Sequence, residues 1–152
     1  MLEKERKTVP GIQSIKTDSY CFGAEAFRAW ARDIGNGKFD NMTTEEFDPW
    51  GYHTNYVCVL ATNGSCCHEY LKRAQNLNPD MTFLEEISRL YKRFGEMWNN
   101  DHGTDLEALS GGFNVTLEVL QDKERRGKIA AKLKDFAKVT DEIVRVLTEG
   151  MR

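Results

Sequence analysis

The chain has 152 residues, of which 40% are hydrophobic and 30% charged, and its formal net charge is −3. This length suits one domain with a sizeable core, and the mildly acidic balance argues against nucleic-acid binding, which predicts a basic surface. The sequence has no apolar run near the roughly 18 residues of a membrane span. Its charged start, MLEKERKTVPGIQSIK, lacks the apolar centre of a signal peptide. We therefore expect a cytoplasmic protein that binds neither nucleic acid nor membrane.

Residues 1–20 show no apolar period, and Pro10 and Gly11 interrupt them, so we predict a flexible arm or linker there. A single helical domain is then expected over residues 21–150. Its first helix is predicted within FGAEAFRAWARDIGNGKF and ends at Gly35. One apolar face of that helix is indicated by Phe22, Ala26, Ala29, Trp30 and Ile34. A short helix is also predicted at 44–47.

The next segment, YVCVLATNGSCCHEYLKRAQNL, can be interpreted in two ways. Taken alone, YVCVLAT is typical of a strand and Asn63-Gly64 of a hairpin turn, but no alternating second strand follows. A single helix from about Tyr52 to Leu77 instead gathers the apolar residues on an arc of roughly 140°. That arc holds Tyr52, Tyr56, Val59, Leu60, Asn63, Cys66, Cys67, Tyr70, Leu71, Ala74 and Leu77. We predict one helix, in which Gly64 serves either the close approach of a neighbouring helix or a cavity.

Three further helices follow, each opened by a capping signal. Thr82 with Glu85 begins one, Thr104 with Glu107 begins another, and Asp122 caps the last, which ends at Gly150. The middle helix keeps its phase from Leu106 to Leu120 across Gly111 and Gly112, which serve either packing or a cavity. The last carries a seam close to a heptad: Ile129, Leu133, Phe136, Thr140, Ile143 and Leu147. The fold class is therefore all-α, a bundle of four to five amphipathic helices with short loops.

The adjacent residues Cys66, Cys67 and His68 are the first candidates for chemistry. Their spacing does not match a zinc site, so we expect no metal and no cofactor. On one continuous helix, both cysteines lie on the apolar arc as core thiols and His68 lies at its polar edge. If a helix began at Ser65 instead, its dipole would favour a reactive thiolate. The alternative function is then a thiol-dependent acyl-transfer or amide-hydrolysing enzyme that uses Cys66 or Cys67.

Aromatic residues offer a candidate ligand site. Trp50, Tyr52, His53 and Tyr56 could wall a pocket between helices, which keeps open a second alternative, a small-molecule sensor. The basic run KERRGK, residues 123–128, contains an acidic residue and no aromatic one. We predict that it forms a solvated face of the last helix.

Three segments of the chain carry a resemblance to a known family. They are FGAEAFRAWARDIGNGKF, YVCVLATNGSCCHEYLKRA and LEALSGGFNVTLEVLQDKERRGKIAAKL. Over roughly residues 20–148 the pattern resembles the helical C-terminal region of bacterial proteins related to butirosin biosynthesis protein H. In those proteins a cysteine-peptidase-like domain comes first, so the resemblance implies that the catalytic cysteine and histidine belong to that preceding domain. We therefore expect an accessory domain without its own catalytic residues, which binds a partner protein or small ligand. A homodimer and the preceding domain are the candidate partners.

Overall fold

The structure, a computed structural model, describes residues 21–48, 55–99 and 116–152, with the backbone alone for residues 55–63 and 98–99. All regular secondary structure in these ranges is helical, which confirms the predicted all-α bundle. The helices are α1 (Ala24–Gly35), α2 (Asn55–Leu77), α3 (Phe83–Asn99), α4 (Leu117–Gln121) and α5 (Lys123–Gly150). Within the described ranges, no helix is long and apolar enough to cross a membrane.

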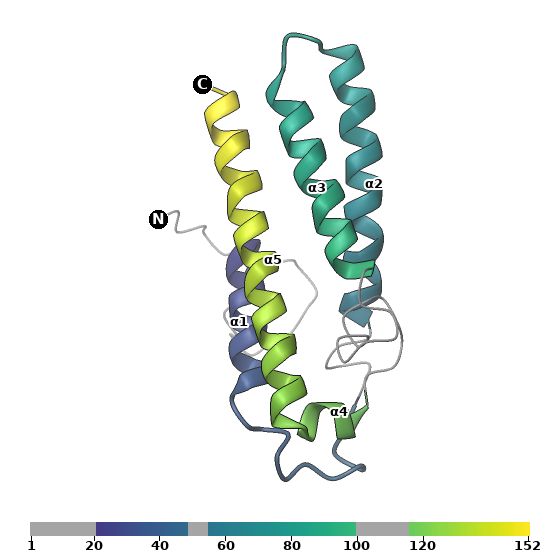
Figure 1. Ribbon diagram of the computed structural model, residues 1–152, viewed down its shortest axis with the longest axis vertical. Coiled ribbons are helices and arrows are strands. Elements are labelled where there is room, and N and C mark those ends of the chain that lie inside the picture. Colours follow the sequence, from purple (N-terminus) through teal and green to yellow (C-terminus); the bar gives the residue numbers. More distant parts are fainter. Residues whose placement is uncertain (1–20, 49–54, 100–115) are drawn as a thin grey trace, which may run out of the picture.

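The long helix α5 is the centre of the arrangement. It runs antiparallel to both α1 and α3 and packs against each of them, while α2 packs against α3 at the edge of the bundle (Figure 1). The short α4 leads into the start of α5. Because α2 is an edge helix, α3 covers only one of its sides.

An aromatic cluster joins three helices in the core. Phe27 of α1 stacks on Phe136 of α5 with ring centroids 5.7 Å apart, and Phe94 of α3 lies 5.0 Å from Phe136. All three side chains are buried. The predicted seam of α5 is confirmed at Ile129, Leu133, Phe136 and Ile143, whereas Leu147 at its far end is 41% exposed. Such large apolar side chains are the main source of stability in a bundle of this size.

The buried face of α1 differs from the predicted one. It consists of Ala24, Phe27, Ala31 and Ile34. Phe22 is 82% exposed, so the prediction that it belongs to the core is wrong. The physical reason is that α1 begins only at Ala24, after Gly23 with φ of 58°, so Phe22 precedes the helix and does not share its period.

Residues 44–47 form a turn and not the predicted short helix. The backbone N–H groups of Glu46 and Phe47 donate to the carbonyls of Thr43 and Thr44 at 3.2 and 3.3 Å. These bonds span three residues, as in a turn, and no helical ladder follows them.

The predicted helix from residue 104 to 120 is also interrupted. Thr116 has an extended backbone, with φ of −109° and ψ of 156°, and its side chain caps α4 by accepting from the N–H of Val119. The prediction of one unbroken helix through Thr116 is therefore wrong. Gly111, Gly112 and the predicted cap at Thr104 lie outside the described residues.

The start and end of α5 agree with the prediction. The carboxylate of Asp122 accepts from the N–H groups of Glu124 and Arg125 at 2.9 and 3.1 Å, as an N-cap does. The helix ends at Gly150, where an added Cβ would lie 2.3 Å from the ring of Phe83. Gly150 thus lets the end of α5 approach the start of α3.

Candidate functional site

Helix α2 runs without a break through Asn63-Gly64, which confirms the single-helix prediction. A Cβ added at Gly64 would lie 2.7 Å from both the Cα and the N of Gly95 on α3. Real Cβ atoms do not approach backbone that closely, so glycine is required here. Of the two roles that the sequence left open for Gly64, the structure shows helix packing.

The side of α2 that faces α3 is not the centre of its apolar arc. Gly64 marks the contact, and at 100° per residue Cys66, Tyr70 and Leu77 lie about 120° to 160° from it around the helix. Cys66 is exposed, Tyr70 is 71% exposed and Leu77 is 81% exposed. The prediction that these three residues are buried is therefore wrong, whereas Cys67 and Leu71, which lie closer to Gly64 around the helix, are half-buried.

The uncovered residues of the arc form a continuous row together with Arg73, which lies just outside the edge of the arc. We name as the α2 stripe the residues Cys66, Tyr70, Arg73 and Leu77, whose spacings of four, three and four residues place them within about 60° of one another. All four are exposed. Isolated exposed apolar side chains are ordinary, but a row on one helix marks a candidate interaction surface.

The two thiols of α2 lie in the middle of a helix of 23 residues. Because the helix does not begin at Ser65, the helix dipole gives neither thiol the stabilisation that a first-turn cysteine receives. Burial raises the pKa of Cys67, and the neighbouring Cys66 adds to that rise. The condition under which the sequence would favour a cysteine nucleophile is thus not met.

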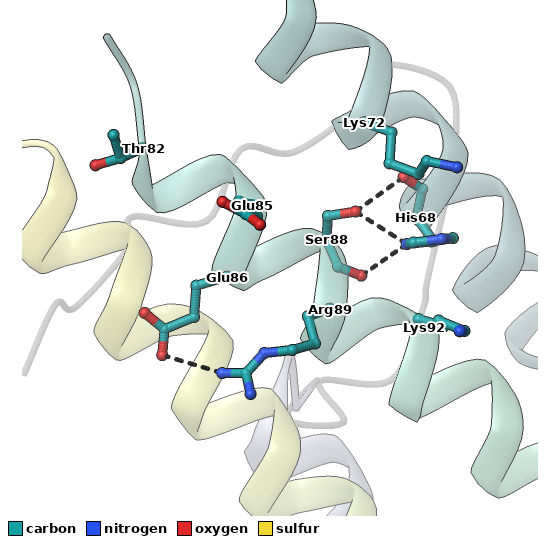
Figure 2. Close-up of a pocket in the computed structure, with 8 residues that line it drawn as sticks. All are labelled: His68, Lys72, Thr82, Glu85, Glu86, Ser88, Arg89 and Lys92. Atoms are coloured by element: carbon teal, nitrogen blue, oxygen red, sulfur yellow. Dashed lines mark hydrogen bonds and ion pairs between the residues drawn. The ribbon is translucent and has the colours of Figure 1, made fainter. Parts of the chain in front are cut away.

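The side chain of His68 is bound to α3 (Figure 2). Its Nδ1 lies 3.0 Å from the carbonyl oxygen of Ser88 and 2.9 Å from the Ser88 hydroxyl, which itself donates to the His68 carbonyl at 3.2 Å. A carbonyl oxygen can only accept, so Nδ1 carries the proton. A serine nucleophile would need Nδ1 to accept its proton. This pair is therefore a clasp between two helices and lacks the arrangement of a catalytic dyad.

Sequence reasoning missed this clasp, although a signal was present. Ser88 lies on α3 between Ile87 and Leu90, and all three are buried. A serine on an apolar helix face needs a hydrogen-bond partner. The sequence could therefore have indicated that some polar side chain faces Ser88, but not that it is His68.

An open cleft lies beside the clasp. Figure 2 shows its lining by His68 and Lys72 from α2, by Thr82 just before α3, and by Glu85, Glu86, Ser88, Arg89 and Lys92 from α3. Its charges balance locally, since Arg89 lies 3.8 Å from Glu86, and Glu69 lies 3.5 Å from Lys72 and 3.8 Å from His68 Nε2. Among the described residues, no group of three histidine, cysteine or carboxylate side chains is placed to hold a metal ion. The rim of the cleft thus carries charges of both signs, without an excess that would attract a strongly charged ligand.

The basic run 123–128 contains a buried cation. Arg126 is 4% exposed, so the prediction of a solvated face is wrong at this position. Its guanidinium lies 2.6 Å from Asp40 and donates to the Leu120 carbonyl at 2.7 Å. The hydrogen bond from Arg126, and then its charge, lower the pKa of Asp40. This group fastens the loop after α1 to the junction of α4 and α5, which is a structural role.

The predicted aromatic pocket has no described geometry. Trp50, Tyr52 and His53 lie outside the described residues, and Tyr56 lies in α2 where only the backbone is described. Their role as ligand-binding residues stays a prediction.

Comparison with known proteins gives no relative: no family model, no curated protein and no solved structure matches the chain. The resemblance to proteins related to butirosin biosynthesis protein H stays a prediction. Any function must therefore be argued from the geometry of the described residues.

Proposed function

We propose that this chain is a non-catalytic helical accessory domain that binds a partner through the α2 stripe. The observation that carries the proposal is the exposure of Tyr70 and Leu77, 71% and 81%, on the same side of one helix. Tyrosine is one of the usual anchors of protein interfaces, and an exposed leucine beside it adds apolar surface that a partner can cover. Covering them with a partner removes apolar surface from water, which is the main favourable contribution to association.

The packing of α2 against α3 supports this role. On its other side, Gly64 meets the backbone of Gly95 and His68 is bound to Ser88, so both the position and the rotation of the helix are fixed. A stripe on a fixed helix loses little conformational freedom when a partner binds. A preformed binding surface is what an accessory domain requires.

The same contacts give little support to the alternative of a thiol-dependent enzyme. Cys66 is exposed, but the neighbouring imidazole of His68 is bound to α3 and donates from Nδ1. Cys67 has a raised pKa, which disfavours its thiolate form. Among the described residues, the exposed thiol of Cys66 thus has neither a base nor a helix dipole to activate it as a nucleophile.

Site-specific photo-crosslinking tests the proposal. A benzoylphenylalanine in place of Tyr70 is irradiated in the purified full chain and in an extract of its source cells, with the same residue in place of the exposed Lys134 of α5 as control. We expect one discrete adduct at position 70, absent at position 134 and lost when Leu77→Glu is added. Equal or absent adducts at the two positions would contradict the proposal.

A further inference from the structure

We infer that the partner that the α2 stripe binds is a second copy of this chain, packed antiparallel along α2. The inference rests on the proposed function and adds the identity and orientation of the partner. Its starting point is the order of side chains along the stripe: a thiol, an aromatic ring, a cation and an aliphatic group, at Cys66, Tyr70, Arg73 and Leu77.

This order is complementary to its own reverse. When two copies of α2 lie antiparallel with the two-fold axis between Tyr70 and Arg73, Cys66 of one copy faces Leu77 of the other. In the same register the ring of Tyr70 faces the guanidinium of Arg73, which is a favourable cation–π arrangement. Each contact occurs twice, as the two-fold symmetry of an isologous dimer requires.

The charge of Arg73 gives an independent reason for this register. Arg73 forms no ion pair with any of the described residues, although it stands in the middle of an otherwise uncharged row. Antiparallel packing places Glu69 of the second copy, one residue before its Tyr70, within reach of this cation. Parallel packing would instead place Arg73 opposite Arg73 of the second copy, and like charges at that distance repel.

A second copy explains the stripe better than an unrelated partner does. An unrelated partner needs a surface that complements the stripe, but nothing requires the stripe to complement itself. The stripe has to complement its own reversed order only when the same surface lies on both sides of the interface. With α3 on one side of each α2, the dimer would contain four helices in the order α3, α2, α2, α3, packed with the ordinary spacing of helices.

The first test is the molar mass of the full chain in solution, measured by light scattering at tens of micromolar. We expect a dimer for the wild type and a rise of at least tenfold in dissociation constant for Leu77→Glu, which buries a charge at each end of the interface. The matched control is Val144→Glu, which places the same charge on the 55% exposed Val144 of α5 and leaves the dimer unchanged. A monomeric wild type, or equal weakening by both variants, would overturn the inference.

A charge exchange tests the predicted ion pair within the dimer. Arg73→Glu alone places two carboxylates together across the interface, so we expect weaker association. Adding Glu69→Arg restores opposite charges and should recover most of the affinity. Weakening without recovery would overturn the antiparallel register, because Glu69 and Arg73 would then not face each other.

A disulfide tests the register itself. In the Leu77→Cys variant, Cys66 should form a disulfide with the new cysteine of the second copy under mild oxidation, as shown by peptide mapping. In the wild type, the two Cys66 residues would lie about 17 Å apart along the helix axis, too far for a disulfide. The control Lys134→Cys should give no such link. A dominant Cys66–Cys66 disulfide would indicate parallel packing and overturn the inference.

Failure of the inference and failure of the proposed function give different results. A monomer in solution whose position 70 crosslinks to a different protein, in a manner lost with Leu77→Glu, refutes the second copy and leaves the binding role of the stripe. A monomer without any adduct specific to position 70 refutes both.

Discussion

The two helix pairs of this molecule, α1 with α5 and α2 with α3, are held together by different contacts. Aromatic side chains fill the space between α1 and α5, with Phe27 stacked on Phe136. Between α2 and α3 the backbones meet at Gly64, and a histidine–serine clasp holds them beside it. The rings keep the backbones of α1 and α5 apart, whereas the glycine lets the backbones of α2 and α3 touch. On the side of α2 away from this contact, Cys66, Tyr70 and Leu77 stay exposed and are thus available to a partner.

The largest expected effect is the loss of an aromatic ring between α1 and α5. Phe136→Ala removes a fully buried ring that contacts Phe27 and Phe94, so we expect the free energy of unfolding to fall by about 3 to 5 kcal/mol. Urea denaturation measures this decrease in the free energy of unfolding. The matched control on the same helix is Val144→Ala at a 55% exposed position, where the change should stay below about 0.5 kcal/mol. Similar values for both variants would mean that Phe136 is not at the centre of the core.

The contact between α2 and α3 should respond to a single methyl group. Gly64→Ala places a Cβ 2.7 Å from the backbone of Gly95, and the helices must separate, so we expect a net loss of about 2 kcal/mol despite the better helix propensity of alanine. Gly127→Ala in α5 is the control, since the added Cβ would meet no atom within 4 Å beyond its chain neighbours and the adjacent backbone of its own helix. It should gain up to about 1 kcal/mol. Thermal unfolding shows whether each variant is more or less stable than the wild type. A gain in stability for Gly64→Ala would contradict the close approach of the two helices.

The clasp should contribute less than the glycine contact. Ser88→Ala removes the hydroxyl that bonds to the ring and carbonyl of His68, while the bond from Nδ1 to the carbonyl of residue 88 remains. We therefore expect a loss of about 1 kcal/mol in urea denaturation. Thr148→Ala removes an exposed hydroxyl that donates to the Val144 carbonyl at 2.7 Å and should cost only a few tenths of that value. Equal costs would show that burial does not strengthen the clasp.

The same contrast explains what could be predicted from the sequence. The seam of α5 was predictable because neighbours on two sides cover it, so apolar residues such as Leu133 are also the buried ones. The spacing of the apolar residues also predicted that α2 is a helix, but it did not predict which side of α2 is buried. The residues that define its contact with α3, Gly64 and His68, carry no hydrophobic signal. Arg126 was missed because its partner, Asp40, is distant in the sequence and only the fold brings them together.

The pair of the buried Arg126 and the partly exposed Asp40 gives the smallest effect, and this effect depends on pH. The pKa of Asp40 is lowered in the folded protein by the hydrogen bond and the charge of Arg126, relative to its ordinary value of 3.8. The folded state therefore binds the proton less readily than the unfolded state. The stabilisation is fully present above the ordinary pKa and is lost as the pH falls below it, through the lowered value.

Asp40→Asn tests this argument, because its side chain keeps the shape but cannot titrate. We expect the variant to be less stable than the wild type at neutral pH, with a difference that shrinks as the pH falls below about 4. Urea denaturation from pH 7 to pH 2 measures both curves. Solvent screens the partly exposed carboxylate, which keeps the effect small. Parallel curves over the whole range would show that the cost of the variant does not depend on the ionisation of Asp40, and that Asp40 does not hold the buried Arg126 by its charge.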